Sequence, residues 1–251
     1  MKTLPILAFC VAMFLLPASS FAQEAAAEAA DTASRIKKLT AAHKEKMNAF
    51  SEKMQGASRE EQRALYQSEY PDSSGAAAAI TGIVKANPEA EASLSGINWV
   101  LRNSRGKVDK EIYTILEKHY LDSEKMTDVM GSMMRQSSPE AKAFLKTASE
   151  KSEVKDVRGL AIYAMAIGIE RDASKVDEYT ALIEKLVAEH PDLEVRGRNV
   201  AARAKGKLFA AKNLAIGKEA PEIVGKDVDG KEMKLSDYRG KVVVIDFWGD
   251  W

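Results

Sequence analysis

The sequence contains one cysteine, Cys10, and only three histidines in 251 residues. Cys10 lies in an apolar N-terminal stretch, so the rest of the chain has no thiol to form a disulfide, attack a substrate or bind a metal. His43, His119 and His190 fall in different predicted helices, each without a second ligand one helical turn away. We therefore predict no metal site and no cofactor.

The sequence also lacks an excess of charge of either sign, with 37 Lys and Arg against 37 Asp and Glu. This balance argues against a protein that binds nucleic acid through a basic field. Neither a phosphate-binding glycine loop nor a nucleophile elbow is present. With 45% hydrophobic and 29% charged residues, the chain has enough apolar material for a core and enough charge for a solvated surface.

Residues 1–22 have the pattern of a secretory signal peptide. Lys2 supplies the positive start, residues 4–16 the apolar stretch, and residues 20–22 a small-x-small cleavage site. We expect an exported protein of the periplasm or cell envelope. A membrane anchor is the alternative, but the apolar stretch is shorter than a bilayer requires. Lipid attachment to Cys10 would need a small residue before it, and Phe9 is large, so we predict that Cys10 is not lipidated.

Residues 23–33 form an Ala/Glu run without large apolar side chains, which predicts a flexible or weakly helical leader. Residues 34–215 predict an all-α domain. Apolar residues from Ile36 to Met54 recur at helical spacing, so a first helix should end near Gly56. The run that begins at Ser58 is a capping box that should start the second helix.

Three later helix starts are predicted where an acid follows proline, because proline suits the first helical position and the acid meets the helix dipole. An acid-Val-Arg-Gly pattern followed by alanines occurs at residues 156–164 and again at residues 194–204. The two copies are about 38 residues apart, a spacing found in helical-hairpin repeats. The region is predicted to be a repeat-like array of helical hairpins that presents a surface or docks another protein. The three helix starts involve Pro88, Pro139 and Pro191.

Two clusters in this region have a structural and a functional interpretation. Four methionines at helical spacing suit a packed helix face better than a soft metal or haem site. Carboxylates that alternate with lysines suit a solvated face better than acid/base catalysis. The methionines are Met126, Met130, Met133 and Met134, and the carboxylates are Asp177, Glu178 and Glu184.

The pattern changes from helix to strand at residues 216–222, where glycine and proline interrupt the helical spacing. Apolar residues on both sides of Asp229-Gly230 predict a two-residue β-hairpin. A short turn follows, and residues 242–247 then form a β-branched run typical of a buried central strand. Only one hairpin is available upstream as a neighbour, so the sheet for this strand is mostly absent from the chain.

The order of these motifs resembles the start of a thioredoxin-fold domain of the bacterial TlpA/ResA and AhpC/TSA (redoxin) type. That family opens with a G-x-x-A-P loop, continues with a hairpin and an L-S-D-y-r-G-K turn, and reaches a strand that ends in F-W-a-x-W. The resemblance implies an incomplete α/β thioredoxin fold over residues 216–251, after a mainly α region. The matching loop residues are Gly217, Ala220, Pro221 and Gly240.

The resemblance also implies roles for residues near the end of the chain. Asp246 corresponds to an acid that lies beneath the redox dithiol, where a raised pKa would assist proton transfer. The alternative is a strand-end acid that faces solvent. Phe247, Trp248 and Trp251 correspond to residues that flank the redox site. The partners implied are protein disulfides or thiol redox proteins.

The resemblance places the first redox cysteine directly after Trp251, so the chain itself is predicted to be catalytically inactive. One explanation is a premature stop, a sequence edge or a cloning boundary. Another is a UGA codon decoded as selenocysteine, whose selenol would be a more acidic and more nucleophilic group. The main hypothesis is the N-terminal part of an exported thiol-disulfide oxidoreductase or peroxiredoxin-like enzyme. The alternative is a secreted helical-repeat binding or scaffold protein with a vestigial, non-catalytic redoxin segment.

Overall fold

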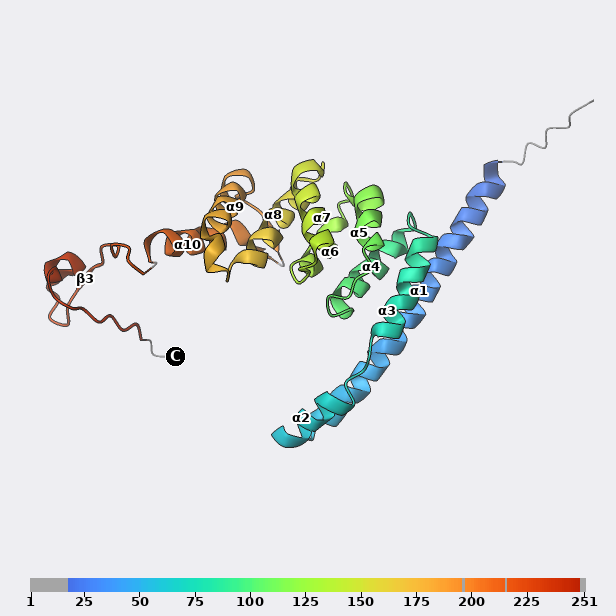
Figure 1. The fold of residues 1–251 in the computed structure, drawn as a ribbon, viewed down its shortest axis with the longest axis horizontal. Coiled ribbons are helices and arrows are strands. Elements are labelled where there is room, and N and C mark those ends of the chain that lie inside the picture. Colours follow the sequence, from blue (N-terminus) through green and yellow to red (C-terminus); the bar gives the residue numbers. More distant parts are fainter. Residues whose placement is uncertain (1–17, 196, 215, 249–251) are drawn as a thin grey trace, which may run out of the picture. The chain divides into compact units, whose positions relative to one another are not determined.

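The computed structural model describes residues 18–195, 197–214 and 216–248, and it is mainly α-helical (Figure 1). The chain divides into two compact units, Met1–Ala164 and Met165–Trp251. The predicted boundary at residue 216 therefore falls inside the second unit and stays a prediction. Most of the predicted signal, residues 1–17, lies outside the described residues. Within those residues, no helix combines the length and apolar character needed to cross a membrane.

Helix α1 (Ala18–Gln55) includes the stretch predicted to be a flexible leader. Residues 23–33 are helical because alanine and glutamate are strong helix formers and the helix that follows continues back through them. The side chain of Thr32 is fully buried, and Asp31 pairs with Arg35 one turn further on at 3.4 Å. The predicted end near Gly56 is confirmed.

Helix α2 (Arg59–Ser68) packs back against the end of α1. Its predicted capping box is present, since the Glu61 amide donates to the Ser58 hydroxyl and the Ser58 amide donates to the Glu61 carboxylate. Phe50 lies edge-on to Tyr66, with ring centres 5.7 Å apart, and to Tyr70 at 5.4 Å. α2 buries no residue of its own, and besides the rings the Gln62 side chain attaches it to α1 by donating to the Met54 carbonyl at 3.1 Å.

Helices α3 (Ser74–Ala86) and α4 (Glu91–Asn103) lie beside α1 and form the centre of the first unit (Figure 1). Gly96 of α4 allows the close approach. A methyl group on Gly96 would lie 3.0 Å from Ile36 and Ile80 and 3.3 Å from Val84. Those three side chains are buried, so the contact has little room to yield.

Pro88 does not start a helix as predicted, because the turn before α4 is held by side chains instead. The hydroxyl of Tyr120 donates to the carbonyls of Pro88 and Ala90 at 2.6 and 2.8 Å, and the Ser93 hydroxyl donates to Asn87. Burial, with a smaller contribution from the charge of Glu89, raises the pKa of Tyr120 to about 12. The donor comes from a π-helical turn (Leu116–Tyr120) that follows α5 (Glu111–Ile115).

Helices α6 (Met126–Met133) and α7 (Pro139–Lys151) match their predictions. Pro139 occupies the first turn of α7, and the Ser138 hydroxyl accepts from the Ala141 amide at 3.2 Å. Three of the four methionines are fully buried, namely Met126, Met130 and Met133, while Met134 is half-buried. The packed-face interpretation of these methionines is therefore confirmed.

Helix α8 (Lys155–Ile169) continues into the second unit, which contains a 3₁₀ turn (Ala173–Lys175) and the packed pair α9 (Val176–Glu189) and α10 (Val200–Asn213). A two-stranded hairpin, β1 (Glu194–Val195) and β2 (Arg198–Asn199), lies between α9 and α10, so this part is not purely α. The carboxylates of α9 are solvated as predicted. Asp177, Glu178 and Glu184 are exposed, and the last two pair with lysines.

Two predictions fail at this hairpin. Pro191 does not start a helix, because its carbonyl accepts from the Asn199 side chain at 3.0 Å and buried Leu193 anchors a turn. The echoed pattern is not a structural repeat either. Gly159 lies inside helix α8, whereas Gly197 has a positive φ of 70° in the hairpin.

Candidate functional site in the C-terminal segment

The hairpin predicted at the start of the C-terminal segment is present, with a longer loop than expected. Strand β3 (Val224–Lys226) pairs antiparallel with β4 (Glu232–Lys234). The Asp227 amide donates to the Lys231 carbonyl, which leaves three residues in the loop. Gly230, with φ of 79°, takes the left-handed position. The Asp227 carboxylate accepts from the amides of Asp229 and Lys231, and this bonding favours the longer loop.

The turn after β4, a 3₁₀ helix (Leu235–Tyr238), is fastened to the start of the segment. The Leu235 amide donates to the Ile223 carbonyl at 2.9 Å, and the Ser236 amide donates to the Glu222 carboxylate at 3.0 Å. The side-chain and backbone hydrogen bonds from Ser236 lower the pKa of Glu222. These bonds bring the G-x-x-A-P loop and the L-S-D-y-r-G-K turn together.

The two glycines of the predicted family motifs have backbone conformations that other residues rarely adopt. Gly217 has φ of 85° and Gly240 has φ of 81°. Between them, the Arg239 guanidinium pairs with the Glu219 carboxylate at 2.6 Å. The loop before the hairpin and the turn after it are therefore joined by an ion pair as well as by hydrogen bonds.

The stretch predicted to be a strand, residues 242–247, forms no strand in the structure. A strand needs a hydrogen-bonded neighbour, and none of the described residues pairs with it. Exposure nevertheless alternates along the stretch, with Val242 and Val244 97% and 90% exposed and Val243 and Ile245 43% and 46% exposed. Alternation of this kind is the side-chain period of an extended chain.

The less exposed face of this stretch borders a small cavity. Val243 and Ile245 line a space of about 420 Å³ together with Ala220, Leu235 and Tyr238. Ala220, a predicted family loop residue, thus lies at the cavity, while Pro221 is half-buried. Glu219, Glu222, Ser236 and Arg239 also line this cavity, so it has polar as well as apolar walls.

The residues predicted to flank a redox site do not gather into a site here. Asp246 is exposed, falls on the same alternating face as Val242 and Val244, and does not line the cavity. Phe247 and Trp248 are 84% and 85% exposed. Trp251 lies outside the described residues. Cys10, the sole cysteine, also lies outside them, so the described segment contains no thiolate to carry out disulfide exchange.

Sequence reasoning missed the residues that fasten the segment together. Glu222 and Ser236 are 14 positions apart, and Glu219 and Arg239 are 20 apart, so no local period connects them. The sequence signal that could have identified these pairs is the position of their members relative to the two motifs. Each pair has one member in or directly after the G-x-x-A-P loop and one in the L-S-D-y-r-G-K turn.

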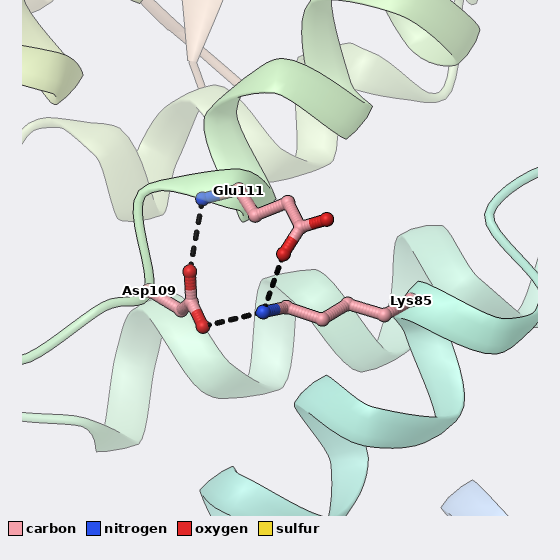
Figure 2. A network of polar contacts seen from close by, with 3 residues as sticks. All are labelled: Lys85, Asp109 and Glu111. Atoms are coloured by element: carbon pink, nitrogen blue, oxygen red, sulfur yellow. Dashed lines mark hydrogen bonds and ion pairs between the residues drawn. The ribbon is translucent and has the colours of Figure 1, made fainter.

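A second polar cluster lies in the first unit, where Lys85 is held between two carboxylates (Figure 2). Its ammonium group lies 2.7 Å from Asp109 and 2.5 Å from Glu111, and the Glu111 amide donates to Asp109 at 3.0 Å. The hydrogen bond from Lys85 lowers the pKa of Asp109. The cluster lies at the start of α5, where negative charge is favourable, and Lys85 pairs with both carboxylates, so we assign it a structural role. Among the described residues, no group of three or more potential ligands is placed to hold a metal ion.

Part of the chain is similar to curated thiol-disulfide oxidoreductases. The relatives are named thiol-disulfide oxidoreductase ResA. Identity is 44% over 45 residues for Bacillus subtilis, 43% over 47 for Bacillus thuringiensis subsp. konkukian and 53% over 38 for Geobacillus kaustophilus. These matches cover 18%, 19% and 15% of this chain and 25%, 27% and 22% of the relatives. The chain thus spans about a quarter of their length. No protein-family model and no solved structure matches the chain.

Proposed function

We propose that this protein is an exported thiol-disulfide oxidoreductase whose thioredoxin-like domain begins at residue 216. In this proposal residues 216–251 supply the opening loop, hairpin and first central strand of the domain. The observation that carries the proposal is the 43–53% identity to ResA proteins over 38–47 residues. We assign this match to the C-terminal end of the chain because the family motifs lie there, and at 38–47 residues the match is longer than residues 216–251 alone.

The local geometry of the segment supports this assignment. Gly217 and Gly240 adopt the positive φ angles that explain why glycine stands at both motif positions. The Glu222–Ser236 and Glu219–Arg239 contacts connect the two motifs. In the completed domain, neighbouring strands would pair with residues 242–247 and bury their alternating face.

In the whole protein we propose that Asp246 lies beneath the dithiol and that Phe247, Trp248 and Trp251 border it. Protein disulfides or thiol redox proteins would be its partners. The helical region would dock a partner or hold the redox domain in place. The signal-like residues 1–22 support export to the periplasm or cell envelope, with cleavage before Gln23.

A reconstitution experiment tests the proposal. The part of Bacillus subtilis ResA that follows its counterpart of Trp251 is appended to this chain, and reduction of insulin disulfides is measured. We expect the fusion to be active because it combines the opening elements with a dithiol. A matched fusion with the first appended cysteine replaced by serine should be inactive. A soluble, folded fusion without activity would contradict the proposal.

The chain without any addition should reduce neither insulin disulfides nor peroxide above a buffer blank. Its only cysteine lies in the predicted signal peptide, so no thiolate remains after cleavage. Turnover that survives replacement of Cys10 by serine would show that another group performs the chemistry.

A second candidate is a helical binding protein with a non-catalytic redoxin segment. The observation that favours it is the first unit, which has a buried core of its own, whereas residues 242–248 are exposed. Reading the coding sequence past the codon for Trp251 separates the two candidates. An open frame with the rest of a thioredoxin fold supports the oxidoreductase, and unrelated or decayed sequence supports the binding protein.

A further inference from the structure

The first unit contains a groove whose charged lining residues all carry positive charge. It lies between α1, α4 and the turn after α6, and has a volume of about 730 Å³. We call it the basic groove and define it by Lys37, His43, Lys44, Trp99, Arg102 and Arg135. No aspartate or glutamate is among the described residues that line it. Its volume lies in the range of pockets that bind small molecules.

The four cations of the basic groove have no acidic partner among the described residues, unlike other cations of the same unit. Lys85 and Lys125 each pair with a carboxylate from another part of the chain. Within the described residues, Lys37, Lys44, Arg102 and Arg135 form no ion pair. The sequence also places no acid three or four positions from any of them, so helical spacing offers none either.

Arg135 is brought to the groove by hydrogen bonds on both sides of it. The Ser132 hydroxyl donates to the Asn98 side-chain oxygen at 2.6 Å, and the Gln136 side chain donates to the Leu101 carbonyl at 2.8 Å. Gln136 is buried, so the second bond is shielded from water. These bonds fix the turn after α6 against α4 and place Arg135 in the same groove as Arg102.

A contact between buried His43 and half-buried Trp99 forms another wall of the groove. His43 lies edge-on to Trp99, with ring centres 5.3 Å apart and planes at 88°. Burial and the charge of Lys46 lower the pKa of His43, against an opposing effect of Asp72. Burial thus favours the neutral imidazole, which can add hydrogen-bonding capacity without further charge.

We propose that the basic groove binds a small molecule that carries two or more oxyanion groups, either carboxylates or phosphates. Like charges held together repel one another, and a bound polyanion removes that repulsion. The guanidinium groups of Arg102 and Arg135 suit carboxylate and phosphate oxygens, which they can bind in pairs. Trp99 and Met47 give an uncharged surface for the rest of the ligand. This inference does not depend on the proposed redox function.

Calorimetric titration of the full chain at low ionic strength tests the proposal, with citrate and inorganic pyrophosphate as probes. Binding of citrate alone identifies a carboxylate ligand, binding of pyrophosphate alone a phosphate ligand, and binding of both the shared oxyanion chemistry. The double variant Arg102→Gln, Arg135→Gln should bind the preferred probe about tenfold or more weakly, because charge-assisted bonds are lost.

The double variant Arg59→Gln, Arg63→Gln is the matched control. It removes the same charge from exposed residues of α2, outside the groove, and should keep the affinity of the original chain. Circular dichroism should show that both variants keep their helices. The proposal is overturned if the original chain binds neither probe, or if the two double variants lose affinity equally.

Discussion

The first unit, called the helical unit here (residues 18–164), and the C-terminal segment (residues 216–248) differ in the interactions that stabilise them. In the helical unit, large side chains such as Phe144, Ile97 and Met130 are almost completely buried. In the C-terminal segment the large apolar side chains remain exposed, including Phe247 and Trp248. Hydrogen bonds, an ion pair and left-handed glycines shape that segment instead. Motifs can thus form local turns without a core, whereas a central strand requires its neighbours.

The largest expected difference between the two regions is the effect of deleting an aromatic side chain. Phe144→Ala should lower the free energy of unfolding by about 3–5 kcal/mol, because it leaves a cavity in the helical core. Phe247→Ala should change it by less than about 0.5 kcal/mol, because the ring is 84% exposed. Urea unfolding followed by helical circular dichroism measures both values. Equal losses would show that Phe247 belongs to the same core.

Adding a methyl group probes how tightly the helical unit is packed. Gly96→Ala should destabilise it by about 1–3 kcal/mol, since the methyl would meet buried Ile36, Ile80 and Val84. Gly82→Ala on α3 is the control, because nothing lies within 4 Å of its added methyl. That change should stabilise the protein by about 0.5–1 kcal/mol through helix propensity. Thermal unfolding of the pair checks the opposite signs, and a stabilising Gly96→Ala would contradict the close approach.

The helix cap at Ser138 should have a smaller effect. Ser138→Ala removes the acceptor for the Ala141 amide and should cost about 1 kcal/mol. Ser138→Asp keeps a capping oxygen and should retain most of the stability. Urea midpoints of the two variants make the comparison, and equal midpoints would mean that the cap contributes little to α7.

The smallest effect is expected in the C-terminal segment, from the titration of Glu222. Its pKa is lowered in the folded segment, so its stabilising contribution is present above the ordinary carboxyl value of 4.5 and is lost as pH falls below it. The Ser236 amide resonance should therefore shift as the pH falls below the ordinary carboxyl value of 4.5. Glu222→Gln, which does not titrate, is the control. An amide that responds identically in both proteins would rule out Glu222 as the titrating group.

Local signals in the sequence predicted much of this structure. The capping box at Ser58, the proline start at Pro139 and the buried methionines of α6 are all local patterns, and each is confirmed. The failures at Pro88 and Pro191 arise from side-chain donors 32 and 8 positions further along the chain. Tyr120 and Asn199 bind the carbonyls of those prolines, and no short-range pattern reveals such contacts.

In the candidate site, too, local sequence patterns predicted backbone conformation but not contacts between separate parts of the chain. The motif glycines could be placed because each requires a particular backbone angle. The strand at residues 242–247 was predicted from its β-branched composition, but strand formation depends on partners that the described residues do not supply. The basic groove escaped prediction because its cations come from three separate parts of the chain.

Hydrogen exchange of the monomeric chain tests the central claim most directly, namely that the helical unit is stable by itself while the C-terminal segment is only locally held. We predict slow exchange for core amides of α3, α4 and α7. We predict exchange close to the intrinsic rate for residues 242–248, which have no ladder hydrogen bonds in the structure. Slow exchange of residues 242–247 in a monomer would contradict the account.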